Sequence, residues 1–444
     1  MLKKVCLILA VSLIATAASA QELAPNAANA PEPYNCDFDP SCEVAPGVYG
    51  KMSSPVSSKF KLSLGGFVKL DYVYNSVNLG SNGALGTLQP NGIPKKGSVA
   101  DQQDQSIFTA RQSRLWFKVA GPTFKGAKTG AVIETDFYGS GGNNESANMR
   151  MRHAYGTMDW ENTQLLFGQY WDAFGMANAS TLDFGLGATA GTPQQPRVAQ
   201  IRVTQKVPLT ERETLKLSLS LQNPVQDTNQ QNGSATDTWG SAVNVAGQAV
   251  LVSKALGVAP GLWGLYMNSL QAGFFGLYGT ESAGPTGKEL ASWGYGFYSF
   301  VPVLASKDGK SRTMTAAFEG QAYQASNMSF NYATATSLIG PSNDRTGAKG
   351  YGIFAQGMFY PTQNLGLTTG YGKRAAYDQA SYAGVANYQQ SSSQIFANVS
   401  YDINAAIRLA AEYQSLETKY DNNTPGTSDQ GSADVFRFSA FYFF

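Results

Sequence analysis

Hydrophobic and polar residues alternate one by one along many segments of this chain of 444 residues. In the C-terminal segment VFRFSAFYFF, every second residue from Phe436 to Phe444 is apolar, and Arg437 and Ser439 fall between them. This spacing is typical of an extended strand, whose successive side chains point to opposite faces. The same period recurs in KLSLGGFVKLDYVYN, RQSRLWFKVAG, GAVIETDFYG, MRMRHAYGTM and AAIRLAAEYQSL. The pattern predicts many strands, each with one apolar and one polar face.

Two kinds of connection alternate between these strands. Short ones are rich in turn-forming residues, as in GPTFKG, DWEN, PLTERE, SKDGKS, YPTQN and YDIN. Eight long polar ones span residues 76–106, 139–147, 172–196, 223–241, 283–288, 325–348, 378–391 and 418–432. Eight long connections predict about sixteen antiparallel strands. Fourteen or eighteen remain alternatives, because the connection after Ser253 is hard to place.

The composition indicates what the two faces of the strands meet. Charged residues make up 14% of the chain, against roughly 25% in soluble domains. The chain has 23 Tyr, 24 Phe and 47 Gly, and we find no apolar run of about 18 residues beyond the N-terminus. Only helices and closed barrels can span a bilayer, because every backbone polar group must be paired. We therefore expect an all-β, transmembrane antiparallel β-barrel over residues 59–444. A soluble β-rich binding module is the alternative, but its sheet would need apolar residues on both faces.

The first 58 residues differ from the rest of the chain. Residues 1–20 resemble a cleaved signal peptide, with two lysines, an apolar run and small residues at the end. Residues 21–58 are rich in proline, have no strand period, and predict a short periplasmic extension. In that oxidising compartment, Cys36 and Cys42 are expected to form a disulfide. Removal of Lys3 and Lys4 with the signal peptide leaves 30 of the 32 basic residues, against 31 acidic residues. This balance gives no indication of a nucleic-acid partner.

The aromatic C-terminal strand adds a prediction about location. A soluble protein seldom ends in an exposed apolar strand, which would favour aggregation. The ending, with Phe438, Tyr442 and Phe444 on one face, looks like the signal that the barrel-assembly machinery reads in outer-membrane proteins. We therefore expect an outer-membrane protein in contact with lipid, with short turns in the periplasm and long loops outside. The last strand of a soluble β-sandwich is the alternative.

A series of motifs between residues 131 and 204 resembles one known family. The segments ETDFYGSGG, MRMRHAYGTM, LLFGQYWDAFG, TLDFG and QPRVAQIRVTQ are similar in order and spacing to the DcaP-like trimeric porins, as are GFVKLDYVY and SRLWFKVAG before them. The resemblance implies a homotrimer of sixteen-stranded barrels, an inward-folded third loop, and a preference for small anionic solutes such as dicarboxylates. Members of that family often carry a periplasmic coiled coil. The proline-rich extension here has no heptads, so trimer contacts would come from the barrels alone.

Charged residues on the polar faces are the candidate pore-lining groups. Alternation places Arg150 and Arg152 inward, with His153 toward lipid or a neighbouring subunit. The other inward candidates are Arg114, Lys118, Glu134, Asp136 and Arg202. Clustered cations in a narrow pore favour anions, because an ion that loses water there needs compensation. The alternative is that the arginines pair with the two acids and only brace the wall.

The Gly- and Ala-rich segment 172–196 is the candidate for the inward-folded loop. On that interpretation, Asp172, Asp183 and Arg197 would face the arginines across the constriction. An ordinary outward loop is the alternative. The piece GLGATAG within this segment lacks the Lys-Ser/Thr of a phosphate-binding loop.

An enzyme and a transporter for hydrophobic solutes are the competing functions. A Ser-His-Asp enzyme would have to use His153, the single histidine of the chain, which the alternation places on an apolar face. A fatty-acid type of transporter would need an N-terminal plug, but the extension is polar and the inner faces carry charge. We expect no enzymatic activity, no cofactor and no metal.

Overall fold

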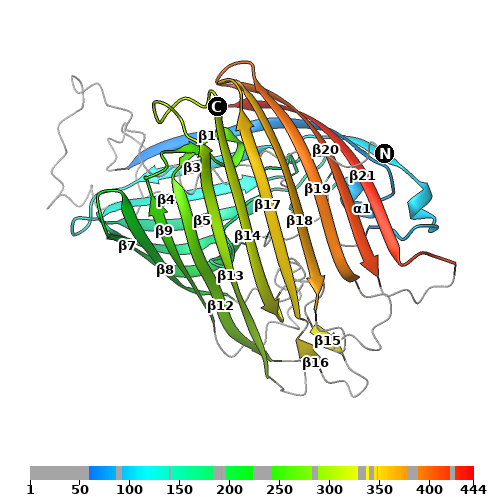
Figure 1. Cartoon of the computed structure of the whole chain (residues 1–444), viewed down its shortest axis with the longest axis horizontal. Coiled ribbons are helices and arrows are strands. Elements are labelled where there is room, and N and C mark those ends of the chain that lie inside the picture. The colour runs from blue at the N-terminus through cyan, green and yellow to red at the C-terminus, as the bar shows by residue number, and fades with distance from the viewer. Residues whose placement is uncertain are drawn as a thin grey trace, which may run out of the picture.

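The computed structural model describes residues 60–86, 93–139, 142–183, 192, 197–223, 243–282, 289–328, 337–339, 345–347, 349–377, 389–420 and 426–444. Within this part of the chain, an antiparallel sheet of seventeen strands closes on itself through pairing of β1 with β21 (Figure 1). Strands β2 and β3 pair in succession with the same edge of β1, so they share one position in the wall. The barrel therefore has sixteen wall positions, and the predicted all-β barrel of about sixteen strands is confirmed.

A tilted strand needs about 9–11 residues to cross a bilayer. The wall strands have 9 to 16 residues, except β2 with 5 and β3 with 7, which share one wall position. In chain order they are β1 Lys61–Asn75, β2 Gln105–Thr109, β3 Arg114–Ala120, β4 Lys128–Asp136, β5 Arg150–Asp159, β6 Thr163–Trp171, β7 Arg197–Pro208, β8 Glu213–Gln222, β9 Asn244–Ser253, β12 Leu270–Ser282, β13 Glu289–Leu304, β14 Thr315–Ser326, β17 Lys349–Tyr360, β18 Leu365–Ala376, β19 Gln389–Asp402, β20 Ile407–Tyr420 and β21 Gln430–Phe443.

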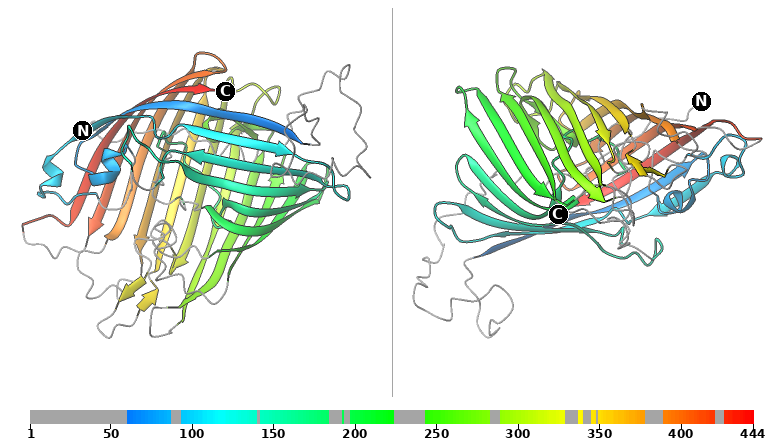
Figure 2. Two further views of the ribbon diagram at one scale, coloured as in Figure 1. Left: turned by 180° about the vertical axis from the view of Figure 1, so that it is seen from behind. Right: turned by 90° about the horizontal axis from the view of Figure 1, so that it is seen from below.

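The remaining elements lie in the connections at the two ends of the barrel. They are α1 Gly80–Ala84, η2 Ala100–Gln102, β10 Ala259–Pro260, η3 Leu262–Gly264, β11 Met267–Asn268, β15 Ser337–Ile339 and β16 Arg345–Gly347. Figure 2 shows the strands as one tilted wall. Short turns such as those at 121–127, 160–162 and 209–212 join strands at one end of it. The connection after Ser253 lies at the short-turn end, although it holds β10, η3 and β11.

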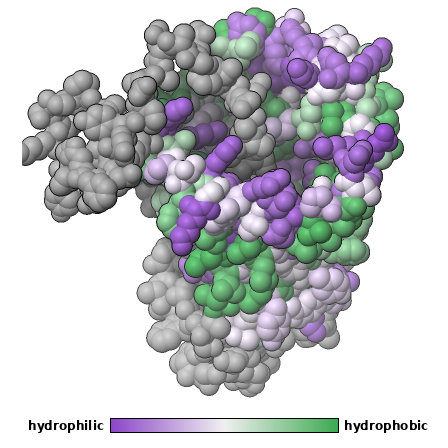
Figure 3. All heavy atoms as spheres, turned by 90° about the vertical axis from the view of Figure 1, so that its left-hand side faces the viewer, coloured by the Kyte–Doolittle hydropathy of each residue, from purple (hydrophilic) through white to green (hydrophobic). Residues whose placement is uncertain are grey.

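The outer surface of the wall is apolar, as the alternating pattern predicts. Large hydrophobic side chains stand exposed on strands all around the barrel, among them Leu62, Phe167, Phe274 and Ile395. On the face shown in Figure 3, hydrophobic side chains gather in patches beside a hydrophilic region. An exposed apolar surface this extensive is stable only against lipid or another apolar partner. No helix in the described part of the chain is long and apolar enough to cross a membrane.

A β-bulge in β5 changes which side chains point into the barrel. Glu134 pairs with His153 and Thr135 pairs with Met151, so Arg152 is an extra residue on β5. Beyond this extra residue the alternation is reversed, because one residue moves every later side chain to the opposite face. His153 is 4% exposed and contacts the rings of Tyr170 and Trp171. The prediction that His153 faces lipid or a neighbouring subunit is therefore wrong.

Candidate pore-lining site

Three arginines share two carboxylates on the inner face of β3, β4 and β5. Arg152 places Nε 2.5 Å from Glu134 Oε1 and Nη1 2.8 Å from Asp136 Oδ2. Arg150 Nη2 lies 2.6 Å from the same oxygen of Asp136, and Arg114 Nη1 lies 3.4 Å from Glu134 Oε1. Arg150 and Arg152 are two residues apart and share the inner side of β5, so both of their guanidinium groups reach Asp136. The bulge brings His153 to the same side. The five charged residues predicted for this part of the wall thus meet, as the bracing alternative requires.

A fourth arginine extends this cluster without a matching acid. Arg197 of β7 places its guanidinium carbon 5.3 Å from the centre of the Trp171 ring, and Arg152 lies 5.7 Å from the same ring. Within the described residues, Arg197 has no ion pair. We call Arg114, Arg150, Arg152, Arg197, Glu134 and Asp136 the arginine cluster. Its four guanidinium groups and two carboxylates carry a formal excess of two positive charges.

The other two predicted basic residues lie away from the cluster. Arg202 of β7 donates from Nη2 to the carbonyl oxygen of Trp171 at 2.5 Å and lies 5.3 Å from the ring centre of Tyr170. Lys118 of β3 lines a cavity at the short-turn end of the barrel. Alternation placed both side chains inward, and within the described residues neither has an ion pair with the cluster.

Residues Asp172–Asp183 run inside the barrel and cross several strands of its inner wall. Their small side chains let the backbone approach the wall, and Ala173 and Ala177 are fully buried. Side chains of the wall bind the backbone N–H groups: Gln321 Oε1 of β14 accepts from Ala177 at 2.9 Å, Gln356 Oε1 of β17 from Ser180 at 2.8 Å, and Glu412 Oε2 of β20 from Leu182 at 2.5 Å. We call Asp172–Asp183 the inner loop. Residues 184–191 and 193–196 of the predicted loop lie outside the described residues.

The two acids of the inner loop bind at its two ends. At the start, Asp172 accepts hydrogen bonds from the backbone N–H of Phe174 and from Gln222 Nε2 of β8, the latter at 3.2 Å. At the far end, Asp183 accepts from Gln112 Nε2 at 2.7 Å and lies 3.6 Å from Arg437 Nη2 of β21. Arg437 was not among the residues that we predicted for the site.

Arg437 is the centre of a second, fully buried charge network. Its Nη1 lies 3.0 Å from Asp71 of β1, and its Nε lies 3.5 Å from Glu412 of β20. Lys69 Nζ lies 2.8 Å from Asp71 and donates to the carbonyl oxygen of Leu182 at 2.6 Å. The network joins the first strand, the last strand and the inner loop. Alternation placed Lys69, Asp71 and Arg437 inward, and that signal alone could have identified them.

The remaining predicted residues have simple placements. Phe438, Tyr442 and Phe444 are each more than half exposed on the outer face, consistent with a lipid-facing C-terminal strand. Cys36 and Cys42 lie outside the described residues, so the predicted disulfide remains an expectation. No group of three or more His, Cys, Asp or Glu that could hold a metal ion occurs within the described ranges.

Comparisons with known proteins agree with this architecture. Residues 44–240 match the profile of a family described as DcaP outer membrane protein. The outer membrane channel DcaP of Acinetobacter baumannii superposes with a TM-score of 0.66 at 18% identity, covering 87% of this chain and 97% of that one. An anion-selective porin from Comamonas acidovorans gives 0.54 at 12% identity, with 87% and 100% covered. No curated protein matches the sequence. The predicted family resemblance is confirmed, and the chain shares the barrel fold of outer-membrane channels.

Proposed function

We propose, from the match of residues 44–240 to the DcaP outer membrane protein family, that this chain forms a passive, water-filled pore that prefers small anions. Its short-turn end lies in the periplasm and its long connections face outside, after removal of residues 1–20. The segment 172–196 is its constriction loop. A passive pore needs no covalent step and no cofactor.

The excess of guanidinium groups in the arginine cluster is the observation that carries the anion preference. Glu134 and Asp136 compensate two of the four positive charges, and two remain. Arg114 and Arg152 are buried and act mainly as braces between strands. Arg150, whose side chain is 18% exposed, and Arg197 are the residues that we assign to contact with passing ions. In a narrow pore with low-dielectric walls, these charges act on a partly dehydrated ion.

Reversal potentials in a salt gradient across a planar bilayer test the proposal. A unit charge about 7 Å from the ion, at an effective dielectric constant of about 60, contributes about 0.8 kcal/mol, or about a fourfold change in permeability ratio. We expect Arg150→Gln and Arg197→Gln each to lower the anion preference by that order. The matched control is Arg212→Gln, in the exposed turn between β7 and β8. A cation-selective wild-type pore would refute the proposal.

We also propose that three barrels associate through their apolar outer faces. The extension carries six prolines, so a helical stalk is not part of this proposal. Migration on a gel before and after boiling tests it, since a trimer gives a high-mass band that boiling removes. A single band at the monomer position in mild detergent would contradict the trimer and leave the pore proposal standing.

A further inference from the structure

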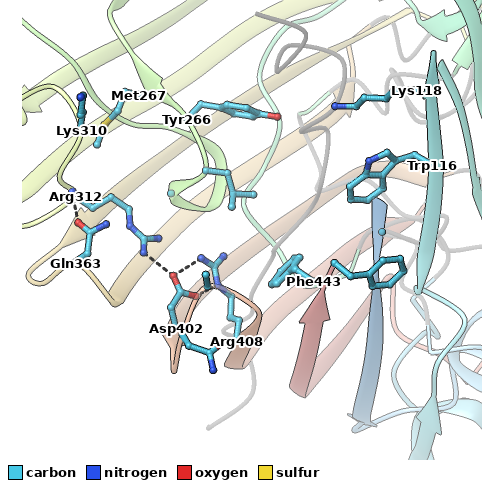
Figure 4. Close-up of a pocket in the computed structure, with 16 residues that line it drawn as sticks. Trp116, Lys118, Tyr266, Met267, Lys310, Arg312, Gln363, Asp402, Arg408 and Phe443 are labelled. Carbon is cyan, nitrogen blue, oxygen red and sulfur yellow. Dashed lines mark hydrogen bonds and ion pairs between the residues drawn. The ribbon is translucent and has the colours of Figure 1, made fainter. Parts of the chain in front are cut away.

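A cavity of about 730 Å³ lies at the short-turn end of the barrel (Figure 4). Lys118 lines this cavity, and no residue of the arginine cluster does. Its lining comes from β3, from the connection between β9 and β12, from the turns after β13, β17 and β19, and from β20 and β21. On the proposed function, this is the periplasmic mouth of the pore. A solute that passes the constriction therefore meets this cavity last.

Positive charge predominates in this cavity. Four basic side chains line it, namely Lys118, Lys310, Arg312 and Arg408, and the one acidic side chain is Asp402. Asp402 is already bound, with Arg312 Nη2 at 2.7 Å and with the Nε and Nη2 atoms of Arg408. Neither Lys118 nor Lys310 has an ion pair with any residue that the structure describes. Two ammonium groups are thus available to an anion.

Apolar and aromatic side chains line the cavity beside the basic ones. Trp116 and Phe443 line it from the barrel wall, and Tyr266 and Met267 line it from the connection between β9 and β12. Figure 4 shows the Tyr266 ring between the side chains of Lys118 and Lys310. Aromatic faces and edges pack well against other rings, and a lysine beside them supplies a charge-assisted contact.

The backbone of that connection is held in a costly conformation. Trp263, in η3, has φ 53° and ψ 24°, a left-handed geometry that a non-glycine residue adopts at a cost of about 1–2 kcal/mol. Its side chain is 3% exposed, and its carbonyl oxygen accepts a hydrogen bond from Arg408 Nη1 at 3.1 Å. The guanidinium of Arg408 therefore fixes both Asp402 and the turn that presents Tyr266. Strain of this kind persists only where surrounding contacts enforce it, and it is often found at ligand sites.

We propose that this cavity binds an organic anion with an apolar ring, of the class of aromatic monocarboxylates, as it leaves the pore. The carboxylate lies beside Lys118, and the ring packs against Trp116 and Tyr266. Lys310, on the opposite side of Tyr266, adds positive charge at longer range. The site differs from the arginine cluster, whose positive charges are guanidinium groups paired in part with Glu134 and Asp136. It would slow the exit of such solutes relative to small inorganic anions.

Titration of the detergent-solubilised protein with 4-nitrobenzoate, a quencher of tryptophan emission, tests binding without requiring conduction. We expect saturable quenching by 4-nitrobenzoate. Benzoate should displace the bound 4-nitrobenzoate and restore the emission, whereas acetate at equal concentration should not. Lys118→Gln is expected to raise the apparent Kd about fivefold, since it removes one unit charge at contact distance in a hydrated site. Lys310→Gln removes a charge from the opposite side of the cavity and should raise the apparent Kd less. Lys307→Gln, on the same turn as Lys310 but outside the cavity, is the matched control and should leave Kd unchanged.

Benzoate applied to a planar bilayer then locates the site along the pore. It should interrupt single-channel current with longer dwell times than acetate or the neutral benzamide, and Lys118→Gln should shorten these dwell times. Equal Kd values for wild type and Lys118→Gln, or displacement by benzamide as effective as by benzoate, would overturn the proposal. An inactive or cation-selective pore with intact, lysine-dependent quenching would refute the proposed function and leave this site standing.

Discussion

Replacing Arg437 of β21 by glutamine removes the guanidinium at the centre of the buried network. In the wild-type protein, Lys69 and Arg437 face three carboxylates, those of Asp71, Asp183 and Glu412. After the substitution, one ammonium group faces three carboxylates in a site with no exposed surface. The inner loop also loses the contact at Asp183 that ties its far end to the wall.

The expected loss follows from the distances. An ion pair at about 3.5 Å is worth about 5 kcal/mol at an effective dielectric constant of about 20, and desolvation of the guanidinium offsets much of the sum over three pairs. Breaking a buried pair on one side usually costs about 3–5 kcal/mol, and we expect that loss in the free energy of unfolding. Arg437→Lys keeps the charge but not the fork of donors, so its loss should be smaller.

Urea unfolding in detergent micelles, followed by tryptophan fluorescence, measures this loss. Arg212→Gln, at an exposed turn, is the control and should change the free energy of unfolding by less than about 0.5 kcal/mol. In single-channel records, Arg437→Gln should also increase current noise, because the inner loop is held less firmly. An unfolding free energy within about 1 kcal/mol of wild type would refute the view that this network stabilises the barrel.

Three further predictions follow from single positions. His153→Ala should lower the free energy of unfolding by about 1–3 kcal/mol, and His153→Phe should lower it less, because aromatic rings surround the site. Equal free energies for the two variants in urea unfolding would argue for a lipid-facing position. Gly66→Ala should impair refolding into detergent, measured by heat-modifiable migration, because an added Cβ would lie 2.4 Å from the Arg114 carbonyl oxygen; unimpaired refolding would show that β1 can shift. Hydrogen bonds from the backbone N–H groups of Ser311 and Lys310 lower the pKa of Asp308 to about 2, so this carboxylate stabilises the turn above its unfolded pKa of 3.8, and the contribution disappears as the pH falls through about 2. Asp308→Ala should therefore lower the thermal midpoint at pH 7 and lower it much less at pH 2, and a loss of the same size at both pH values would contradict this.

The barrel could be predicted because its environment imposes one simple period. Lipid outside and water inside require the outward apolar stripe of Leu62, Leu64, Val68 and Leu70 and the inward Lys69 and Asp71. The alternation of short and long connections then fixed the approximate number of strands. Both inferences need only one assumption about strand neighbours, namely that strands that follow each other in the chain are paired.

The candidate site was less predictable, because it depends on pairing that a single strand does not reveal. The extra residue in β5 is visible only against its partner strand, where His153 and Arg152 both oppose Glu134. The partner of Asp183 is Arg437, and this contact exists because the barrel closes between β1 and β21. Likewise, nothing in the segment from Lys254 to Ser269 signals that Trp263 becomes buried.

The contacts of the inner loop also constrain when it can be seated. The backbone N–H groups of Ala177, Ser180 and Leu182 donate to side chains that lie 144, 176 and 230 residues later in the chain, respectively. Until the later half of the wall has been added, water is the partner of these amides, and such distant contacts form slowly. The inner loop can therefore take its final place only after the later half of the wall has been added, so the lumen narrows late in folding.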